Sequence, residues 1–250
     1  MNRFARVMIC GVLAVAAVSA FQKLKSQKEF DAYKAMVTAT TPDATIAAAE
    51  NLITTFADTE LKPLALFMEA EAYGRKGEFE KCIVFGERAV EADPHSYQAQ
   101  LLLARQYAGH TGENDLDKEE KLTKSAKYAN DAIASIAAAP KPNAQLPDAQ
   151  WDNVKKDYTA QAHEVLGMIG DVRKKYDAAA TEYKTAVDTA ANPDPATMVR
   201  YGMAEEHLGK YDEALATFDK VLALPNAVAA VKQVATNEKA RATAAKAAKK

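Results

Sequence analysis

The side chains best suited to metal binding or acid–base chemistry are scattered along this sequence. Its four histidines are His95, His110, His163 and His207, and no two of them stand three or four residues apart. Two metal ligands on one face of a helix need that spacing, so no local metal site is predicted. Surface or packing roles are expected for all four, and a site assembled from distant segments is the alternative.

Cys82 is the one cysteine outside the apolar N-terminal segment, since Cys10 lies within that segment. If the segment is removed, a single cysteine is left and no internal disulfide can form. A buried cysteine usually behaves as a small apolar residue. We therefore expect Cys82 to pack at a helix contact, and the alternative role of nucleophile or metal ligand is not favoured.

Residues 113–120, ENDLDKEE, have the acidic character of a calcium-binding loop but not its pattern. Counting from Asp115, Glu120 and Ala126 take the places where such a loop requires glycine and a bidentate glutamate. The ten glycines are dispersed, so no glycine-rich phosphate loop is formed. The sequence therefore predicts no catalytic residues, no metal site, no cofactor and no small-molecule substrate.

The first twenty residues are predicted to be an export signal that is not part of the fold. A short basic start with Arg3 and Arg6 precedes an apolar run from Val7 to Ala20 that ends in small residues. The run is shorter than the roughly 20 apolar residues of a membrane-spanning helix, and cleavage is expected after Ala20. An uncleaved anchor in the inner membrane is the alternative.

The overall charge argues against nucleic acid as a partner. The formal net charge is −2, and removal of Arg3 and Arg6 would lower it by two more units. A basic tail begins at Lys232, and we expect it to be a frayed helix end that charge keeps soluble. Membrane contact is expected only through residues 1–20 or this tail.

Residues 63–96 predict two short amphipathic helices joined at Gly77, because apolar or small residues recur every three or four positions. One such hairpin cannot bury its own apolar face, so similar hairpins are expected to stack on it. Before it, Asp43 is placed to cap a helix that runs from about Ala44 to Ala57. The predicted parts of the chain are a signal peptide or anchor (1–20), a degenerate first helical repeat (21–62), an array of repeats (63–228) with an insertion near 109–117 and a connector at 137–147, and a C-terminal capping helix with a basic tail (229–250).

Residues 63–96 resemble a tetratricopeptide repeat, a 34-residue pattern with preferred residue types at fixed places. Counted from Pro63, Glu69 and Gly86 depart from the pattern. Segments counted from Ala160 and Pro195 are in register with it as well. The matching residues are Leu66, Ala70, Tyr73, Cys82, Ala89 and Pro94 in the first segment, Leu166, Gly167, Ala179, Tyr183 and Ala186 in the second, and Met198, Tyr201, Gly202, Gly209, Tyr211, Ala214, Phe218 and Leu222 in the third.

The resemblance implies an all-α fold, a right-handed superhelix (solenoid) of stacked antiparallel helix pairs. It also implies that the first helix of each pair, here called the first arm, lines a concave groove that holds a partner polypeptide. Some of the outward positions on the first arms would alternatively be covered by the connector, the long helix after it or the C-terminal helix. The predicted partner-binding residues are Phe67, Glu71, Leu101, Arg105, Glu164, Met168, Val199 and Met203.

The function implied is that of a non-catalytic scaffold that binds a protein or peptide partner. Many exported proteins of this family act in bacterial envelope assembly, so the periplasm is the expected location. The alternative is an accessory subunit of an envelope complex, anchored in the inner membrane by residues 1–20. An enzyme is the third hypothesis, and it would require polar groups from distant segments to converge on one site.

Overall fold

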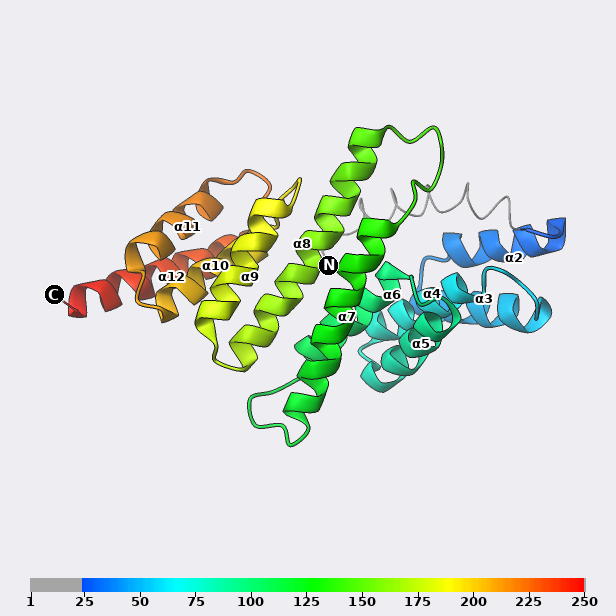
Figure 1. The fold of residues 1–250 in the computed structure, drawn as a ribbon, viewed down its shortest axis with the longest axis horizontal. Coiled ribbons are helices and arrows are strands. Elements are labelled where there is room, and N and C mark those ends of the chain that lie inside the picture. Colours follow the sequence, from blue (N-terminus) through cyan, green and yellow to red (C-terminus); the bar gives the residue numbers. More distant parts are fainter. Residues whose placement is uncertain (1–23, 250) are drawn as a thin grey trace. The chain divides into compact units, whose positions relative to one another are not determined.

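The structure is a computed structural model that describes residues 24–249, and all regular elements in that range are α-helices (Figure 1). The all-α prediction is therefore confirmed. The helices are α2 (Gln27–Thr38), α3 (Pro42–Thr55), α4 (Lys62–Lys76), α5 (Phe79–Ala92), α6 (Tyr97–Gly109), α7 (Lys118–Ala138), α8 (Asp148–Val172), α9 (Tyr176–Thr189), α10 (Pro195–His207), α11 (Tyr211–Ala223) and α12 (Ala229–Ala248).

The helices divide between two compact units. Within the described residues, unit 1 comprises residues 24–106 and 134–151, and unit 2 comprises residues 107–133 and 152–249. Unit 1 thus holds α2 to α5 and most of α6. Unit 2 holds most of α7 and α8 and all of α9 to α12.

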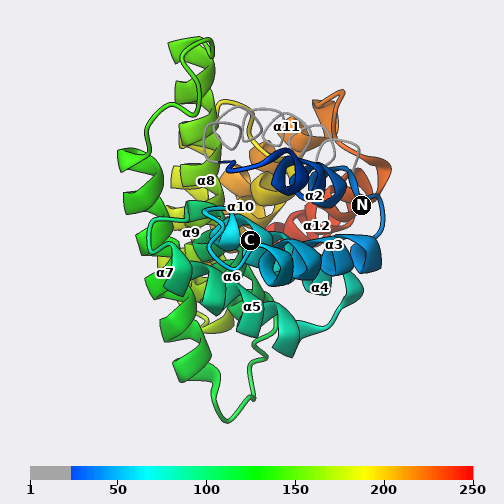
Figure 2. The same ribbon diagram turned by 90° about the vertical axis from the view of Figure 1, so that its right-hand side faces the viewer.

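Unit 1 is built by packing each helix on the next one along the chain. α2 packs on α3, α3 on α4, and α4 on α5, as Figure 2 shows for the first three of these helices. Large apolar side chains from successive helices meet in its core, where Tyr33, Met36, Leu52 and Leu61 are buried. Each helix therefore buries its apolar stripe against a neighbour, as the periodicity predicts.

The start of α3 differs from the sequence prediction by a small shift. Thr41 is the N-cap, and its hydroxyl oxygen accepts a hydrogen bond from the Ala44 N–H at 3.2 Å. Pro42 opens the helix, where its missing N–H costs nothing. The predicted cap at Asp43 is wrong because Asp43 already lies in the first turn, and its carboxylate pairs instead with Lys76 at 2.7 Å.

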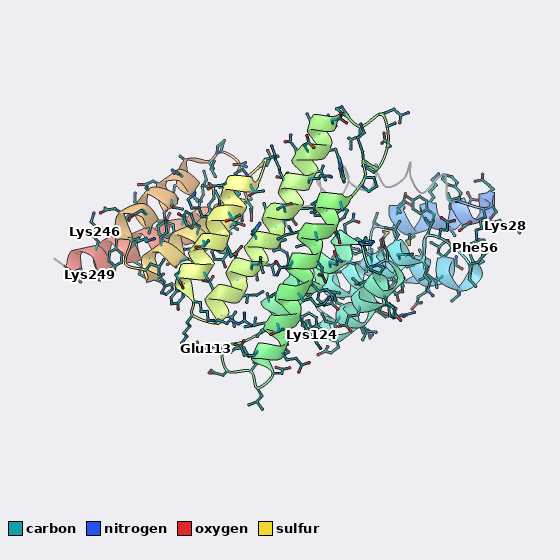
Figure 3. All side chains as sticks on the ribbon, in the orientation of Figure 1. Lys28, Phe56, Glu113, Lys124, Lys246 and Lys249 are labelled. Atoms are coloured by element: carbon teal, nitrogen blue, oxygen red, sulfur yellow. The ribbon has the colours of Figure 1, made fainter. Side chains whose placement is uncertain are left out.

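Unit 2 repeats the same arrangement. α9 packs on α10, α10 on α11, and α12 on both α10 and α11. Its core is assembled around Tyr183 and Phe218, both fully buried. The loop of residues 110–117 also belongs to this unit, and Glu113 of that loop pairs with Lys174 at 2.5 Å (Figure 3).

None of the helices from α2 to α12 is long and apolar enough to cross a membrane. The segment predicted to be a signal peptide or anchor, residues 1–20, lies outside the described residues.

Candidate functional site

Glycines set the distance between the two helices of each pair in unit 2. A Cβ atom at Gly202 of α10 would lie 2.6 Å from Cε1 of Phe218 in α11, closer than van der Waals contact permits. In the same way, a Cβ at Gly167 of α8 would lie 2.5 Å from Cε1 of Tyr183 in α9. Each aromatic ring therefore lies flat against a bare helix backbone, and the first arms are fixed in place by this contact.

The turn between the helices of a pair uses the left-handed backbone conformation in both units. Gly77 and Gly209 have φ values of 75° and 73°, which glycine adopts without a steric penalty. Lys174 takes the same conformation, with a φ of 56°, at the turn between α8 and α9. Three helix pairs are thus closed by one turn geometry, although only two of them have glycine there.

The eight predicted partner-binding residues differ in exposure. Three of them are buried, and their side chains contribute to the interior of their own unit rather than to a surface. The buried residues are Leu101 (5% exposed), Glu164 (6%) and Val199 (4%), whereas Phe67, Glu71, Arg105, Met168 and Met203 are partly exposed. The available surface on the first arms is therefore narrower than the sequence predicts.

In unit 1 the partly exposed residues lie on α4 and α6. Phe67 packs against the core clusters that contain Ala65 and Leu66, which leaves only part of its ring accessible. Burial raises the pKa of Glu71, and the positive charge of Arg75 opposes that shift. This part of unit 1 thus combines a partly exposed aromatic ring with an acidic group whose pKa is raised by burial.

In unit 2 the partly exposed residues are two methionines on successive first arms. Met168 of α8 packs against the cluster formed by Ala179 and Tyr183, and Met203 of α10 packs against the cluster around Phe218. They occupy equivalent places, nine residues into segments counted from Ala160 and Pro195. The same flexible apolar side chain is therefore presented twice in succession.

Arginine–glutamate pairs connect α10 to α8 and to α12 in this unit. Arg200 of α10 lies 3.7 Å from Glu164 of α8, and Arg241 of α12 pairs with Glu206 of α10 at 2.8 Å. Arg241 donates through two nitrogens to both carboxylate oxygens of Glu206, the bidentate geometry that makes such pairs strong. Arg200, Glu206 and Arg241 were not identified from the sequence. An acidic residue on an apolar helix face, as at Glu206, is the signal that such a partner is needed.

A partly buried hydrogen bond links α8 to α9. The hydroxyl of Tyr183 donates to the carboxylate of Asp171 at 2.6 Å. Burial raises the pKa of Asp171, and the hydrogen bond from Tyr183 opposes this shift. The phenol also gains a raised pKa, chiefly from its own burial, so it stays protonated and keeps donating.

The basic tail forms a regular helix. The expectation of a frayed end is wrong, because α12 continues to Ala248 and its charges have partners in α10 and α11. Lys239 pairs with Asp219 at 2.5 Å, Lys246 pairs with Asp212, and the ammonium of Lys249 lies 4.9 Å from the centre of the Tyr211 ring. Figure 3 labels Lys246 and Lys249 at the C-terminal end of this helix. α12 therefore covers the end of the last helix pair.

The residues that could carry chemistry have structural roles where their contacts are known. His163 lies 2.7 Å from Glu182, and the ring of His207 stacks on that of Tyr176 with 4.0 Å between centroids. Burial raises the pKa of the Cys82 thiol to about 11, which keeps it protonated and unreactive at neutral pH. Among residues 24–249, no three histidine, cysteine, aspartate or glutamate side chains are arranged to hold a metal ion.

The chain is similar to tetratricopeptide repeat proteins in one segment of its sequence and in its fold. The tetratricopeptide repeat family matches residues 195–227. A solved thermophilic tetratricopeptide repeat protein from Thermus thermophilus has 17% identity over 81% of this chain and 91% of its own, with a TM-score of 0.55. A tetratricopeptide repeat protein from Parabacteroides merdae has 14% identity over 91% of this chain and 90% of its own, with a TM-score of 0.38.

The comparison with curated protein sequences finds no match. The antiparallel helix pairs are the feature that the resemblance implies. The chain thus carries a tetratricopeptide repeat at residues 195–227, and its described helices have the all-α fold of tetratricopeptide repeat proteins.

Proposed function

We propose that this chain is a non-catalytic scaffold that binds a partner polypeptide through the partly exposed faces of its first arms. The observation that carries the proposal is the repeated presentation of methionine at Met168 and Met203. Methionine is unbranched and polarisable, so it adapts to apolar side chains of different shape. A surface of this kind suits the capture of a peptide segment.

The helices that carry and flank the two methionines are held in place by ion pairs and close contacts, which favours binding. The Arg200–Glu164 and Arg241–Glu206 pairs and the Gly202 contact hold the backbones of α8, α10 and α12 at set positions. A pre-organised surface loses less conformational entropy when a partner binds. The ion pairs also leave polar groups at the edge of the apolar surface, as at the rim of protein interfaces.

Unit 1 offers a second surface of different character. Phe67 and Glu71 on α4 and Arg105 on α6 are partly exposed, so this unit offers an aromatic ring, an acidic group and an arginine on its first arms. Aromatic and arginine side chains are enriched among the residues that dominate binding energy in interfaces. We therefore assign each unit its own contact with the partner, apolar in unit 2 and mixed in unit 1.

The proposed location is the bacterial periplasm, and it rests on the export signal predicted in residues 1–20. The alternative is an accessory subunit that keeps this segment as an inner-membrane anchor. Mass spectrometry of the chain purified from its native source separates the two, because cleavage after Ala20 removes a defined mass. An intact N-terminus on the native chain would contradict export with cleavage.

Site-specific photo-crosslinking tests the binding surface. A photoreactive amino acid is placed at Met168 or Met203 of the full chain in intact cells, and crosslinked products are identified by mass spectrometry. The matched controls are Thr181 of α9 and Lys220 of α11, which are exposed on the second helix of their pairs. We expect one polypeptide to crosslink from both methionine positions and from neither control.

Two outcomes would contradict the proposed surface. Equal crosslinking from Thr181 and Lys220 would show contact without preference for the first arms. Absence of any crosslink from Met168 and Met203, while another position captures the partner, would move the binding site elsewhere. As a second measurement, Met168→Glu and Met203→Glu should each weaken capture while the circular dichroism spectrum stays unchanged.

A further inference from the structure

Glu69 is a buried acid without a complete set of partners. It lies on α4 in unit 1 and is 1% exposed, and no hydrogen bond within the described residues reaches its Oε1 atom. Buried polar atoms nearly always have a hydrogen-bond partner, and an unpaired charge is especially costly to bury. The site therefore favours the neutral, protonated form of this carboxyl group.

The charged groups around Glu69 come from each helix packed against α4. Burial is the main cause that raises its pKa to about 7, and the negative charge of Glu50 on α3 adds to the shift. Arg88 on α5 acts in the opposite direction, and it also lies over the Phe85 ring at 4.9 Å. On α4 itself, the phenol of Tyr73 is near enough for its own pKa to be raised by Glu69.

The equivalent places in unit 2 carry no charge. Counted from Ala160 and from Pro195, the seventh residue is Leu166 and Tyr201, where unit 1 has Glu69. An apolar or aromatic residue would fill this contact at any pH. The acid at this place thus makes the packing in unit 1 depend on protonation, while the corresponding contacts in unit 2 do not.

We propose that Glu69 is a pH-sensitive element, whose loss of a proton weakens the packing of α4 against α3 and α5. The proton is retained by the folded state at a higher pH than by the unfolded chain. Stability contributed by the neutral form is therefore complete below about pH 4.5, falls as the pH rises toward 7 and is then lost. Unit 1 is tightest in mild acid and looser at alkaline pH.

Urea unfolding of the full chain at pH 5.5 and pH 8.5 tests this element, with Glu69→Gln as the variant. Glutamine keeps the size of the side chain but cannot titrate. We expect the folding equilibrium constant of the unmodified chain to fall about 30-fold more than that of the variant between these pH values. Hydrogen exchange of peptides from α3, α4 and α5, corrected for the chemical exchange rate, should show the same difference.

The titration of the carboxyl group itself is the second measurement, and it does not require a variant at Glu69 to fold. In the ¹³C NMR spectrum of the chain labelled at glutamate, one buried carboxyl should titrate near neutral pH. Glu50→Gln should lower the midpoint of that titration, because it removes the like charge. Glu71→Gln is the matched control, and it should leave the Glu69 midpoint in place.

Identical pH dependence in the unmodified chain and in Glu69→Gln would overturn the proposal. A Glu69 midpoint below about pH 5.5 would do the same, because the group would then be ionised throughout the neutral range. The measurements need no binding partner, so their outcome is independent of the proposed scaffold function.

Discussion

Two repeats, residues 63–96 in unit 1 and residues 195–227 in unit 2, differ in how the contact between their paired helices is filled. In unit 2, Gly202 faces Phe218 from the second helix of its own pair. In unit 1 both places hold small residues, since Ala70 and Gly86 stand where unit 2 has the glycine and the aromatic residue. The vacant space over Gly86 is filled by Leu103 of the next helix, α6.

This difference shows that the volume at a helix contact matters more than which helix supplies it. A large side chain opposite a bare backbone satisfies close packing in both units. In unit 2 the contact closes within one pair, whereas in unit 1 it ties the pair to the following helix. The unit 1 repeat therefore departs from the family pattern without leaving a cavity there.

The two repeats also treat their buried acids differently. Glu206 in unit 2 receives two hydrogen bonds from Arg241, whereas Oε1 of Glu69 in unit 1 receives none within the described residues. The first arrangement compensates the burial of charge directly. In the second, the charge of Arg88 offsets only part of the cost of burial, so Glu69 takes up a proton near neutral pH and the contact becomes sensitive to pH.

The largest expected effect on stability comes from alanine substitution at Gly202, and the same substitution at Gly86 should have a much smaller one. Gly202→Ala places a methyl group 2.6 Å from the rigid ring of Phe218, and we expect a net loss of about 1–2 kcal/mol of unfolding free energy. Gly86→Ala places a methyl group 2.8 Å from Cδ2 and 3.1 Å from Cγ of the buried Leu103, an aliphatic side chain that can shift more readily than a ring, and alanine is the better helix former by about 1 kcal/mol. Its effect should be close to zero in urea unfolding. Equal losses in the two variants would contradict the comparison.

Removal of Arg241, the exposed partner of the buried Glu206, should have the next largest effect on stability. Arg241→Ala leaves Glu206 buried and unpaired, and we expect a loss of about 1–2 kcal/mol, reduced by the partial exposure of Arg241. The double variant Arg241→Ala with Glu206→Gln should recover part of this loss in urea unfolding. If the double variant is less stable than the single one, the pair does not act through the buried charge.

Substitutions in the turns between paired helices should change stability by smaller amounts. The changes at Gly77 and Lys174 should have opposite signs. Gly77→Ala puts a side chain in the left-handed conformation and should lose about 1 kcal/mol. Lys174→Gly relieves that conformation in unit 2 and should gain about 0.5 kcal/mol, although it removes the exposed pair with Glu113. Thermal unfolding of the two variants measures the sign of each change in stability. A loss on Lys174→Gly would mean that the ion pair outweighs the backbone strain.

The smallest effects are expected at the exposed ion pairs of α12. Lys239→Ala and Lys246→Ala each remove a pair in which both side chains are well exposed, and each should change stability by less than about 0.5 kcal/mol. The difference in unfolding free energy between each variant and the unmodified chain should vanish in about 1 M salt, because salt screens exposed charges. A loss as large as that of Arg241→Ala would show that burial of the acidic partner does not distinguish the Glu206 pair from these two.

Periodicity and small-residue placement were sufficient to predict the helices and their pairing. The glycine–aromatic match at Gly202 and Phe218 and the departures at Glu69 and Gly86 could all be recognised from residue type and spacing alone. The exposure of the predicted partner-binding residues was predicted less well, because Leu101, Glu164 and Val199 have the spacing of outward positions but are buried. Spacing places a residue on a face of its helix, and it does not say how closely the next helix covers that face.

The amino-acid sequence by itself determined the fold class, because the helical period and the breaks at Gly77 and Gly209 are local properties of the chain. Only the tertiary structure decided which side chains remain accessible, which arginine reaches which glutamate, and that the oxygen of Glu69 lacks a partner within the described residues. These features depend on residues far apart in the sequence that meet at helix contacts. Local patterns carry no information about such distances, so the charges and exposures of the site emerge only on packing.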